Sequence, residues 1–239
     1  MALITRKIRH VHQGVNLESY FACPEGPASS LPGILVAPAW TGCNEQAIER
    51  ANILAQSGYA AFAIDLYGEG RVGRTREECR DLMSGVASDR GFLLDRLLST
   101  LETLSHQPEV DASRIAAIGY CFGGLCVLDL ARGGASLRGV VSLHGIFSPP
   151  TGTPTPPIKA KILVLHGFED PMATPEQGLA LGRELTDRGA DWQLHFYGST
   201  LHAFTNPEAN DRDFGTVYNP LTDARSWRLT QDFLIEVLK

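Results

Sequence analysis

Several features that would define a membrane or nucleic-acid protein are missing from this 239-residue sequence. It has no run of about 18 apolar residues, so we expect no membrane-spanning helix. Residues 1–7 include Arg6 and Lys7 and form no apolar stretch, so we expect no signal peptide. Positive charge is also scarce: 21 Lys and Arg against 27 Asp and Glu give a formal net charge of -6. This balance argues against nucleic-acid and membrane-surface partners.

Cysteine is sparse, and its spacing does not suggest pairing. The five cysteines are odd in number and contain no C-x-x-C pair, a pattern that favours free thiols in a reducing cytoplasm over a disulfide framework. We therefore expect a cytoplasmic protein. The sequence has no His-Glu-x-x-His spacing, and His10 and His12 fall in a predicted hairpin. We accordingly expect neither a metal nor a cofactor.

The most informative stretch is Gly119–Gly124, which reads Gly-Tyr-Cys-Phe-Gly-Gly. The apolar run 114–118 before it predicts a buried strand, and 125–132 after it predicts a buried helix. One residue between two glycines at such a turn is the nucleophile elbow pattern, in which the nucleophile takes a strained backbone conformation. We expect Cys121 to be that nucleophile, facing the first N–H groups of the helix.

Two other interpretations of this turn compete with the nucleophile elbow. A phosphate-binding loop is excluded, because Leu125 and Cys126 stand where that loop needs Lys and Ser or Thr. A buried structural thiol in an ordinary turn remains open on the local pattern, since free cysteine is among the most buried residue types. The residues further along the chain decide between that thiol and a nucleophile.

Strands and helices are predicted to alternate from residue 33 onwards, after a hairpin formed by 7–11 and 15–23. This alternation predicts an α/β fold of the α/β-hydrolase type, a single domain over residues 1–239 with a mainly parallel central sheet and helices on both faces. The predicted strands are 33–37, 59–64, 114–118, 140–144, 160–166 and 192–197, and the predicted helices are 45–56, 75–87, 89–106, 125–132, 175–188 and 221–238.

Two later strands end in loops that carry candidate partners for Cys121. Catalytic loops gather at the carboxyl ends of such strands, in the chain order nucleophile, acid, histidine. Asp170 follows the strand 160–166 and is the expected acid, with Glu169 as its adjacent competitor. His202 follows the strand 192–197 and is the expected base. The joint occurrence of the three groups favours an enzyme over a binding protein that kept the fold and lost the chemistry.

These segments resemble the dienelactone hydrolase family over nearly the whole chain. The resemblance implies an α/β-hydrolase fold, a Cys121-His202-Asp170 triad, and hydrolysis of esters or lactones without a metal or cofactor. The stretches that carry the resemblance are 119–124, 166–170, 202–204, and 58–61 leading to 65–68.

Two positions depart from the members of this family that open dienelactones. The resemblance places Ala39 where those members have a Glu near the resting thiol, and Asn206 where they have an Arg that holds the substrate carboxylate. We therefore expect a small neutral ester or lactone as substrate. A neutral phosphotriester is the alternative, since an oxyanion hole also suits the charge that develops on a phosphoryl oxygen.

The remaining site residues follow from the same fold. We expect the oxyanion to be met by the backbone N–H groups of Phe122 and Trp40. We expect Cys121 to be ionised against His202, because a helix N-terminus and an imidazole both lower a thiol pKa. The segment 205–220 is either a lid or a mobile surface loop. The expected pocket residues are Ala39, Tyr67, Tyr120, Phe204 and Asn206.

Overall fold

The computed structural model describes residues 2–27, 29–151 and 156–239. The chain divides into two compact units, residues 1–117 and 118–239. The boundary between them falls inside strand β5 (Val110–Tyr120), so this strand contributes to both units. The expectation of one domain over the whole chain stays a prediction.

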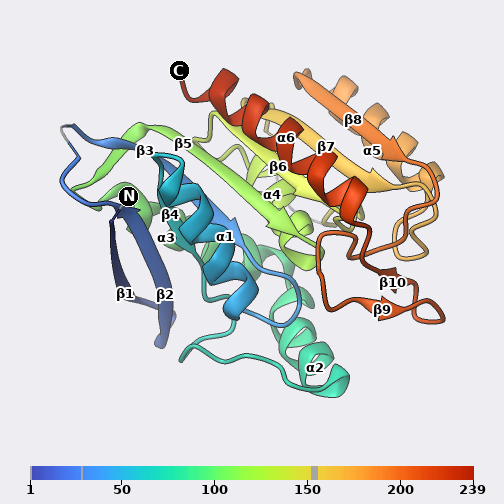
Figure 1. The fold of residues 1–239 in the computed structure, drawn as a ribbon, viewed down its shortest axis with the longest axis horizontal. Coiled ribbons are helices and arrows are strands. Elements are labelled where there is room, and N and C mark those ends of the chain that lie inside the picture. Colours follow the sequence, from blue (N-terminus) through green and yellow to red (C-terminus); the bar gives the residue numbers. More distant parts are fainter. Residues whose placement is uncertain (1, 28, 152–155) are drawn as a thin grey trace. The chain divides into compact units, whose positions relative to one another are not determined.

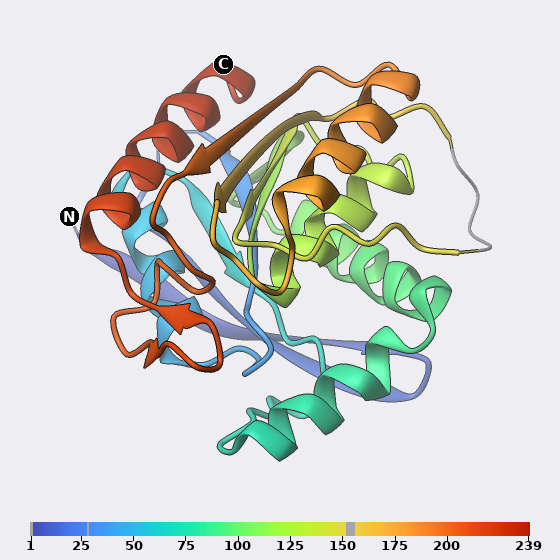
Figure 2. The same cartoon turned by 90° about the vertical axis from the view of Figure 1, so that its right-hand side faces the viewer.

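The first unit begins with an antiparallel hairpin of β1 (Leu3–His12) and β2 (Val15–Pro24). β2 pairs antiparallel with β4 (Ala60–Ala63), which pairs parallel with β3 (Leu31–Ala37). The interior of these strands is apolar and buried. Helix α1 packs on β2, β3 and β4, and α3 packs on β1 and β3 from the other side (Figures 1 and 2). The helices are α1 (Glu45–Gln56), α2 (Arg76–Ala87) and α3 (Arg90–Ser105).

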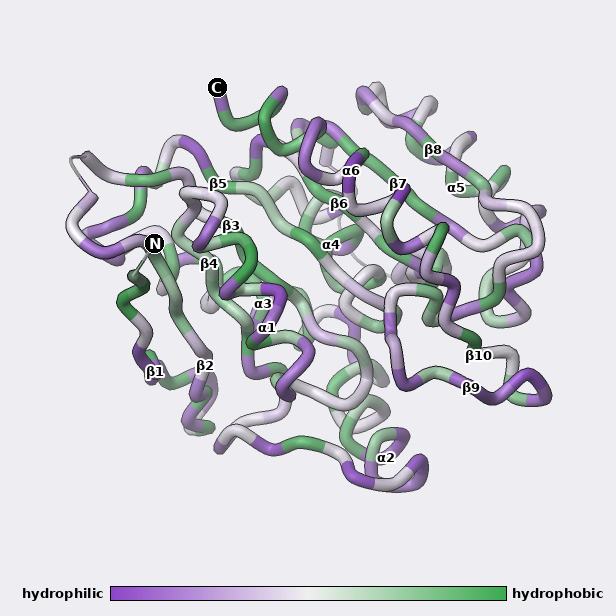
Figure 3. The backbone as a smooth tube through the Cα atoms, viewed as in Figure 1, coloured by the Kyte–Doolittle hydropathy of each residue, from purple (hydrophilic) through white to green (hydrophobic). Residues whose placement is uncertain are grey.

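The second unit continues from β5 into helix α4 and the parallel strands β6, β7 and β8. Helix α6 covers β6 and β7 on one face, while α4 and α5 lie on the other (Figure 2). Figure 3 shows β7 as largely hydrophobic, as a strand covered on both faces should be. The elements are α4 (Phe122–Arg132), β6 (Gly139–Leu143), β7 (Lys161–Gly167), α5 (Pro175–Asp187), β8 (Trp192–Tyr197), β9 (Asn210–Asp211), β10 (Thr216–Val217) and α6 (Pro220–Val237).

In the described residues, eight strands form a sheet in the order β1-β2-β4-β3-β5-β6-β7-β8. The mainly parallel α/β architecture predicted from the alternating pattern is therefore confirmed. None of the helices in the described residues is long and apolar enough to cross a membrane.

Some predicted boundaries were wrong. β5 begins at Val110 rather than at residue 114, because the polar residues before 114 still belong to the strand. α4 begins at Phe122 rather than at residue 125, because the glycine pair after Phe122 is helical. Within 205–220, for which no strand was predicted, the short strands β9 and β10 pair with each other.

Candidate active site

The loop between β5 and α4 is a strained turn centred on Cys121. Cys121 has φ 54° and ψ −115°, a conformation that side-chain-bearing residues rarely adopt. A Cβ added at Gly119 would lie 2.0 Å from the carbonyl oxygen of Gly123, so only glycine fits there. The Cys121 side chain is half-buried. This is the strained turn that the elbow pattern of the sequence predicts.

The elbow leads directly into the first turn of α4. The N–H groups of Gly124 and Leu125 donate to the carbonyl oxygen of Cys121 over 2.9 and 3.4 Å. The N–H of Phe122 precedes this first helical hydrogen bond, so it belongs to the anion-attracting end of α4. That is the position expected of an oxyanion-hole donor.

Asp170 lies buried in the loop after β7, and both of its carboxylate oxygens are engaged. Oδ1 accepts from the backbone N–H groups of Met172 and Ala173 over 2.8 and 3.3 Å. Oδ2 accepts from Nδ1 of His202 over 2.7 Å. Its neighbour Glu169 is exposed. Of the two acids left open by the sequence, Asp170 is therefore the one joined to the histidine.

His202 is buried, and the segment 205–220 holds its backbone in place. Its N–H donates to the carbonyl oxygen of Gly215 over 3.0 Å, and its carbonyl oxygen accepts from the N–H of Val217 over 3.1 Å. A Cβ added at Gly215 would lie 2.2 Å from Cγ of Pro171, the residue after Asp170. The segment 205–220 thus packs against the loop of the acid as well as that of the base.

The pKa of His202 reflects its neighbours. Burial by itself lowers this pKa, but the negative charge of Cys121 and the hydrogen bond to Asp170 outweigh burial and raise the pKa from 6.5 to about 10. A hydrogen bond with the Cys121 side chain also raises this pKa, so the imidazole of His202 interacts with both Cys121 and Asp170.

Two further histidines end strands of the second unit beside these groups. His166 donates from Nε2 to the carbonyl oxygen of Ala173 over 2.8 Å, and the same atom lies 3.4 Å from Oδ2 of Asp170. Burial lowers the pKa of His166, which favours its neutral form. His144 contacts the elbow itself, since its Nδ1 accepts from the backbone N–H of Cys121 over 3.1 Å. Both residues end predicted strands (140–144 and 160–166), so their position near the loops at the strand ends could be read from the sequence, but their contacts could not.

The expected pocket residues differ in burial. Tyr67, Tyr120 and Phe204 are buried, and Ala39 is half-buried. The Phe204 ring packs edge-on against His144 and Tyr197. Oδ1 of Asn206 accepts from the N–H of Glu208 over 2.9 Å, so this side chain caps a turn.

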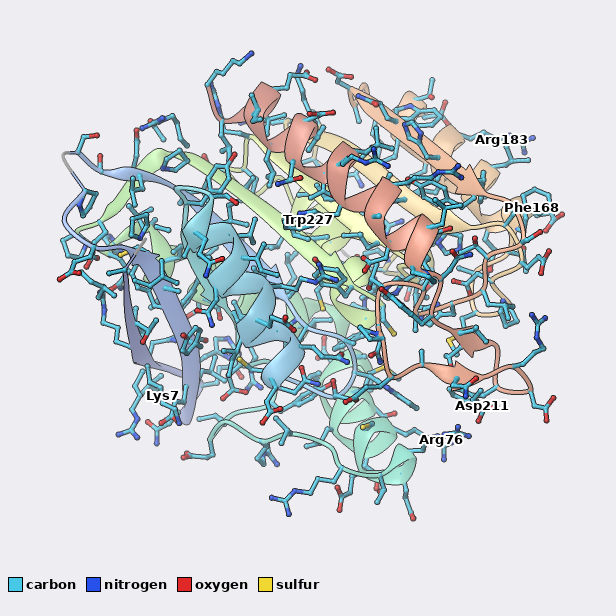
Figure 4. All side chains as sticks on the ribbon, in the orientation of Figure 1. Lys7, Arg76, Phe168, Arg183, Asp211 and Trp227 are labelled. Atoms are coloured by element: carbon cyan, nitrogen blue, oxygen red, sulfur yellow. The ribbon has the colours of Figure 1, made fainter. Side chains whose placement is uncertain are left out.

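The aromatic residues Tyr67, Phe168 and Trp227 differ in their contacts and in their exposure. The hydroxyl of Tyr67 donates to the carbonyl oxygen of Trp40 over 2.7 Å, which fixes the loop after β3. Phe168 is 53% exposed in the loop after β7, and Trp227 lies half-buried on α6 (Figure 4).

No group of three or more His, Cys, Asp or Glu side chains in the described residues could hold a metal ion.

Comparisons with known proteins identify the family to which the chain belongs. The sequence model of the dienelactone hydrolase family matches residues 17–238. The solved structure of a protein named m3DLH is 40% identical, covers all of both chains and superposes with a TM-score of 0.95. The structure of P91, described as a dienelactone hydrolase-like promiscuous phosphotriesterase from metagenomic libraries, is 33% identical over all of both chains, with a TM-score of 0.93.

A curated relative from Caenorhabditis elegans, the uncharacterized protein K02A2.1, is 36% identical over 155 residues, which are 63% of this chain and 98% of the relative. The α/β-hydrolase fold predicted from the alternating strands and helices is confirmed by the solved structures. The match of the family model extends from β2 to the end of α6, through the elbow and the loops of Asp170 and His202. The chain therefore belongs to the dienelactone hydrolase family and is a hydrolase.

Proposed function

We propose that the protein hydrolyses small neutral esters or lactones through Cys121, with His202 as acid and base and Asp170 as the group that orients His202. One observation carries this proposal: the pKa of His202 is raised by the charge of Cys121 while its Nδ1 is held by Asp170. An imidazole placed between a sulfur and a carboxylate is the arrangement that nucleophilic catalysis requires.

In the resting enzyme the proton resides on Nε2 of His202 and Cys121 is a thiolate. The sulfur attacks the substrate carbonyl carbon, and the carbonyl electron pair moves onto oxygen. The N–H of Phe122 faces this oxyanion from the start of α4, a donor typically contributing about 3 kcal/mol of barrier lowering. A second donor at Trp40 stays a prediction.

Collapse of the intermediate breaks the bond to the leaving alcohol, which takes the proton from Nε2 of His202. The product is a thioester on Cys121, whose sulfur carries no charge. Because that charge is one of the causes that raise the pKa of His202, its loss lowers the pKa and makes the imidazole of the acyl-enzyme a better base at neutral pH. It then removes a proton from water as the water oxygen attacks the thioester carbonyl carbon. The bond between sulfur and the acyl carbon breaks, the carboxylic acid leaves, and the ion pair of the Cys121 thiolate and the His202 imidazolium is restored.

Asn206 and Ala39 support a neutral substrate. Asn206 carries no charge, and its side-chain oxygen is already used to cap a turn. Ala39 places no carboxylate in the loop after β3. Neither residue supplies the ionic groups that the dienelactone-opening relatives are expected to have at these positions.

Phosphotriester hydrolysis by the same triad is a second candidate, favoured by the 33% identity to P91, which is described as a promiscuous phosphotriesterase. In that reaction the sulfur would attack phosphorus and expel an aryl alcohol, and water would then release the phosphoryl group from Cys121. A neutral phosphotriester needs no cationic group in the pocket, as with the neutral ester.

A substrate panel on one purified sample tests the proposal. Turnover of aryl acetates, small lactones and aryl phosphotriesters is compared for the parent, Cys121→Ala and His202→Ala. We expect turnover of the esters or lactones by the parent and its loss in both variants. Intact mass after rapid quenching of an aryl ester reaction should show one added acyl group on the Cys121 peptide. Ester turnover that persists in Cys121→Ala would contradict the proposal.

We also propose a cytoplasmic location, because none of the five cysteines forms a disulfide in the described residues. Reduced cysteines, three of them buried, suit a reducing compartment.

A further inference from the structure

His144 follows the last residue of β6 and has a positive φ of 37°, an uncommon conformation for a residue with a side chain. It is buried, and its own N–H donates to the carbonyl oxygen of Leu165 on β7 over 2.9 Å. Strained backbone of this kind persists only where surrounding contacts hold it, and it gathers at functional sites. In this conformation the His144 ring makes two polar contacts with residues of the site.

Each ring nitrogen of His144 contacts a different part of the site. Nδ1 accepts from the backbone N–H of Cys121 over 3.1 Å, an N–H shared with the carbonyl oxygen of Leu143 at the same distance. Nε2 lies 2.8 Å from the hydroxyl oxygen of Thr205, at the start of the segment 205–220. One side chain therefore joins the nucleophile's backbone to the residues that follow the base.

These two contacts define the tautomer of His144. A backbone N–H can only donate, so Nδ1 must be the nitrogen without a proton. The ring proton is then on Nε2, where it is donated to Thr205. The hydrogen bond made by one ring nitrogen sets the state of the other, so Thr205 selects the form that can hold Cys121.

The faces and edges of the ring also position His202. The centroids of the His144 and His202 rings lie 5.1 Å apart, with their planes at 70°. On another side the ring meets Phe204, also at 5.1 Å and edge-on at 81°. A neutral His144 can pack this closely on the imidazolium of His202, whereas a second cation there would repel it.

We propose that His144 is a positioning residue. In its neutral Nε2–H form it holds the backbone of Cys121 and the start of the segment 205–220 in fixed positions relative to His202. The inference rests on the proposed function, because it assigns His144 its role through Cys121 and His202. It also assigns a positioning role to Thr205, whose hydroxyl oxygen accepts the Nε2 proton of His144.

Two amide substitutions separate hydrogen bonding from packing. Both His144→Asn and His144→Gln remove the ring, but Oδ1 of Asn stands as many bonds from Cα as Nδ1 of His and can accept from the Cys121 N–H. The amide of Gln reaches instead to the place of Nε2, towards Thr205. We expect His144→Gln to lower kcat by about 100-fold with little change in KM, and His144→Asn to lower kcat by less than about tenfold.

Thr205→Val is nearly isosteric and removes only the hydroxyl group that accepts from Nε2 of His144. It tests the role of His144 even if the amide variants do not fold. Without the acceptor oxygen, the His144 proton is no longer held on Nε2, and the Nδ1–H form opposes the Cys121 N–H. We expect kcat to fall by about tenfold at similar KM. His195→Asn on β8, which the site does not use, is the matched histidine control and should leave kcat unchanged.

The readouts are kcat, KM and the rate of alkylation of Cys121 by iodoacetamide, measured on its peptide by mass spectrometry. We expect alkylation to slow in His144→Gln and Thr205→Val, but not in His195→Asn. Equal losses in the two amide variants, or unchanged kcat and alkylation in Thr205→Val, would overturn the role of His144. Full activity of Cys121→Ala would instead refute the proposed function, so the two failures are distinguishable.

Discussion

Nδ1 of His202 lies 2.7 Å from Oδ2 of Asp170. Because the carboxylate accepts the Nδ1 proton, Nε2 is the atom through which the proposed mechanism exchanges protons with sulfur and substrate. Replacing Asp170 by Asn removes the charge and permits the wrong tautomer. We expect Asp170→Asn to lower kcat by about 10²–10⁴-fold with a smaller change in KM, measured with an aryl ester.

Glu169→Gln is the control for this change. Glu169 carries the same charge one residue earlier but is exposed. Activity should stay within about twofold, since surface substitutions away from a site have small effects. Equal losses in the two variants would mean that the loop as a whole, rather than the Asp170 carboxylate, supports activity.

The contact between Gly215 and Pro171 yields a prediction about the segment 205–220. Gly215 has φ 82°, and a Cβ there would lie 2.2 Å from Pro171 Cγ. Gly215→Ala should therefore shift the loops that carry Asp170 and His202 and lower kcat by about tenfold or more.

Gly189→Ala separates backbone strain from this collision. Gly189 has a similar φ of 69°, but nothing lies within 4 Å of an added Cβ. We expect both alanine variants to lose about 1 kcal/mol of stability from the left-handed backbone, and only Gly215→Ala to lose activity. A Gly215→Ala enzyme with parental kcat and KM would show that the segment does not support the triad. The lid expectation itself stays a prediction.

The raised pKa of His202 predicts a pH dependence. The charged form is favoured in the folded state, with a pKa of about 10 against the ordinary 6.5. Its contribution to stability is therefore complete below pH 6.5 and is lost as the pH rises through about 10. Cys121→Ala removes the sulfur charge, so the pKa of His202 should fall and this alkaline loss should shrink.

Two measurements check that pH dependence. The His202 ring signals are followed by NMR in the parent and in Cys121→Ala, and urea unfolding is compared at neutral and alkaline pH. We expect a higher titration midpoint in the parent, and a stability difference between the two proteins that narrows towards pH 10. The same midpoint in both would show that the sulfur does not influence His202.

Local sequence pattern predicted most of the strands and helices that carry Cys121, Asp170 and His202. Strand β8 and helix α1 match the predicted ranges at both ends, because each has a clear periodicity and a clear boundary. The start of α4 was missed because glycine disfavours helix, yet tertiary packing requires it at Gly124, where a Cβ would lie 2.6 Å from Cα of Gly145. β9 and β10 are too short, at two residues each, to show any periodicity.

The sequence favoured Asp170 over Glu169 but could not decide between them. Both are acids in the same loop, and the backbone conformation of that loop determines which side chain points towards His202. The contacts of His144 were beyond sequence reasoning for a different reason. They depend on β6 lying next to the elbow and on a positive φ that local pattern does not reveal. The available signal was its place at the end of a strand, which His166 shares.

The role of Cys121 as the proposed nucleophile is tested most directly by kcat/KM of Cys121→Ala for an aryl acetate. We predict a loss of at least about 10³-fold, with folding confirmed by an unchanged far-UV spectrum. Hydrolysis within a few-fold of the parent would contradict this role.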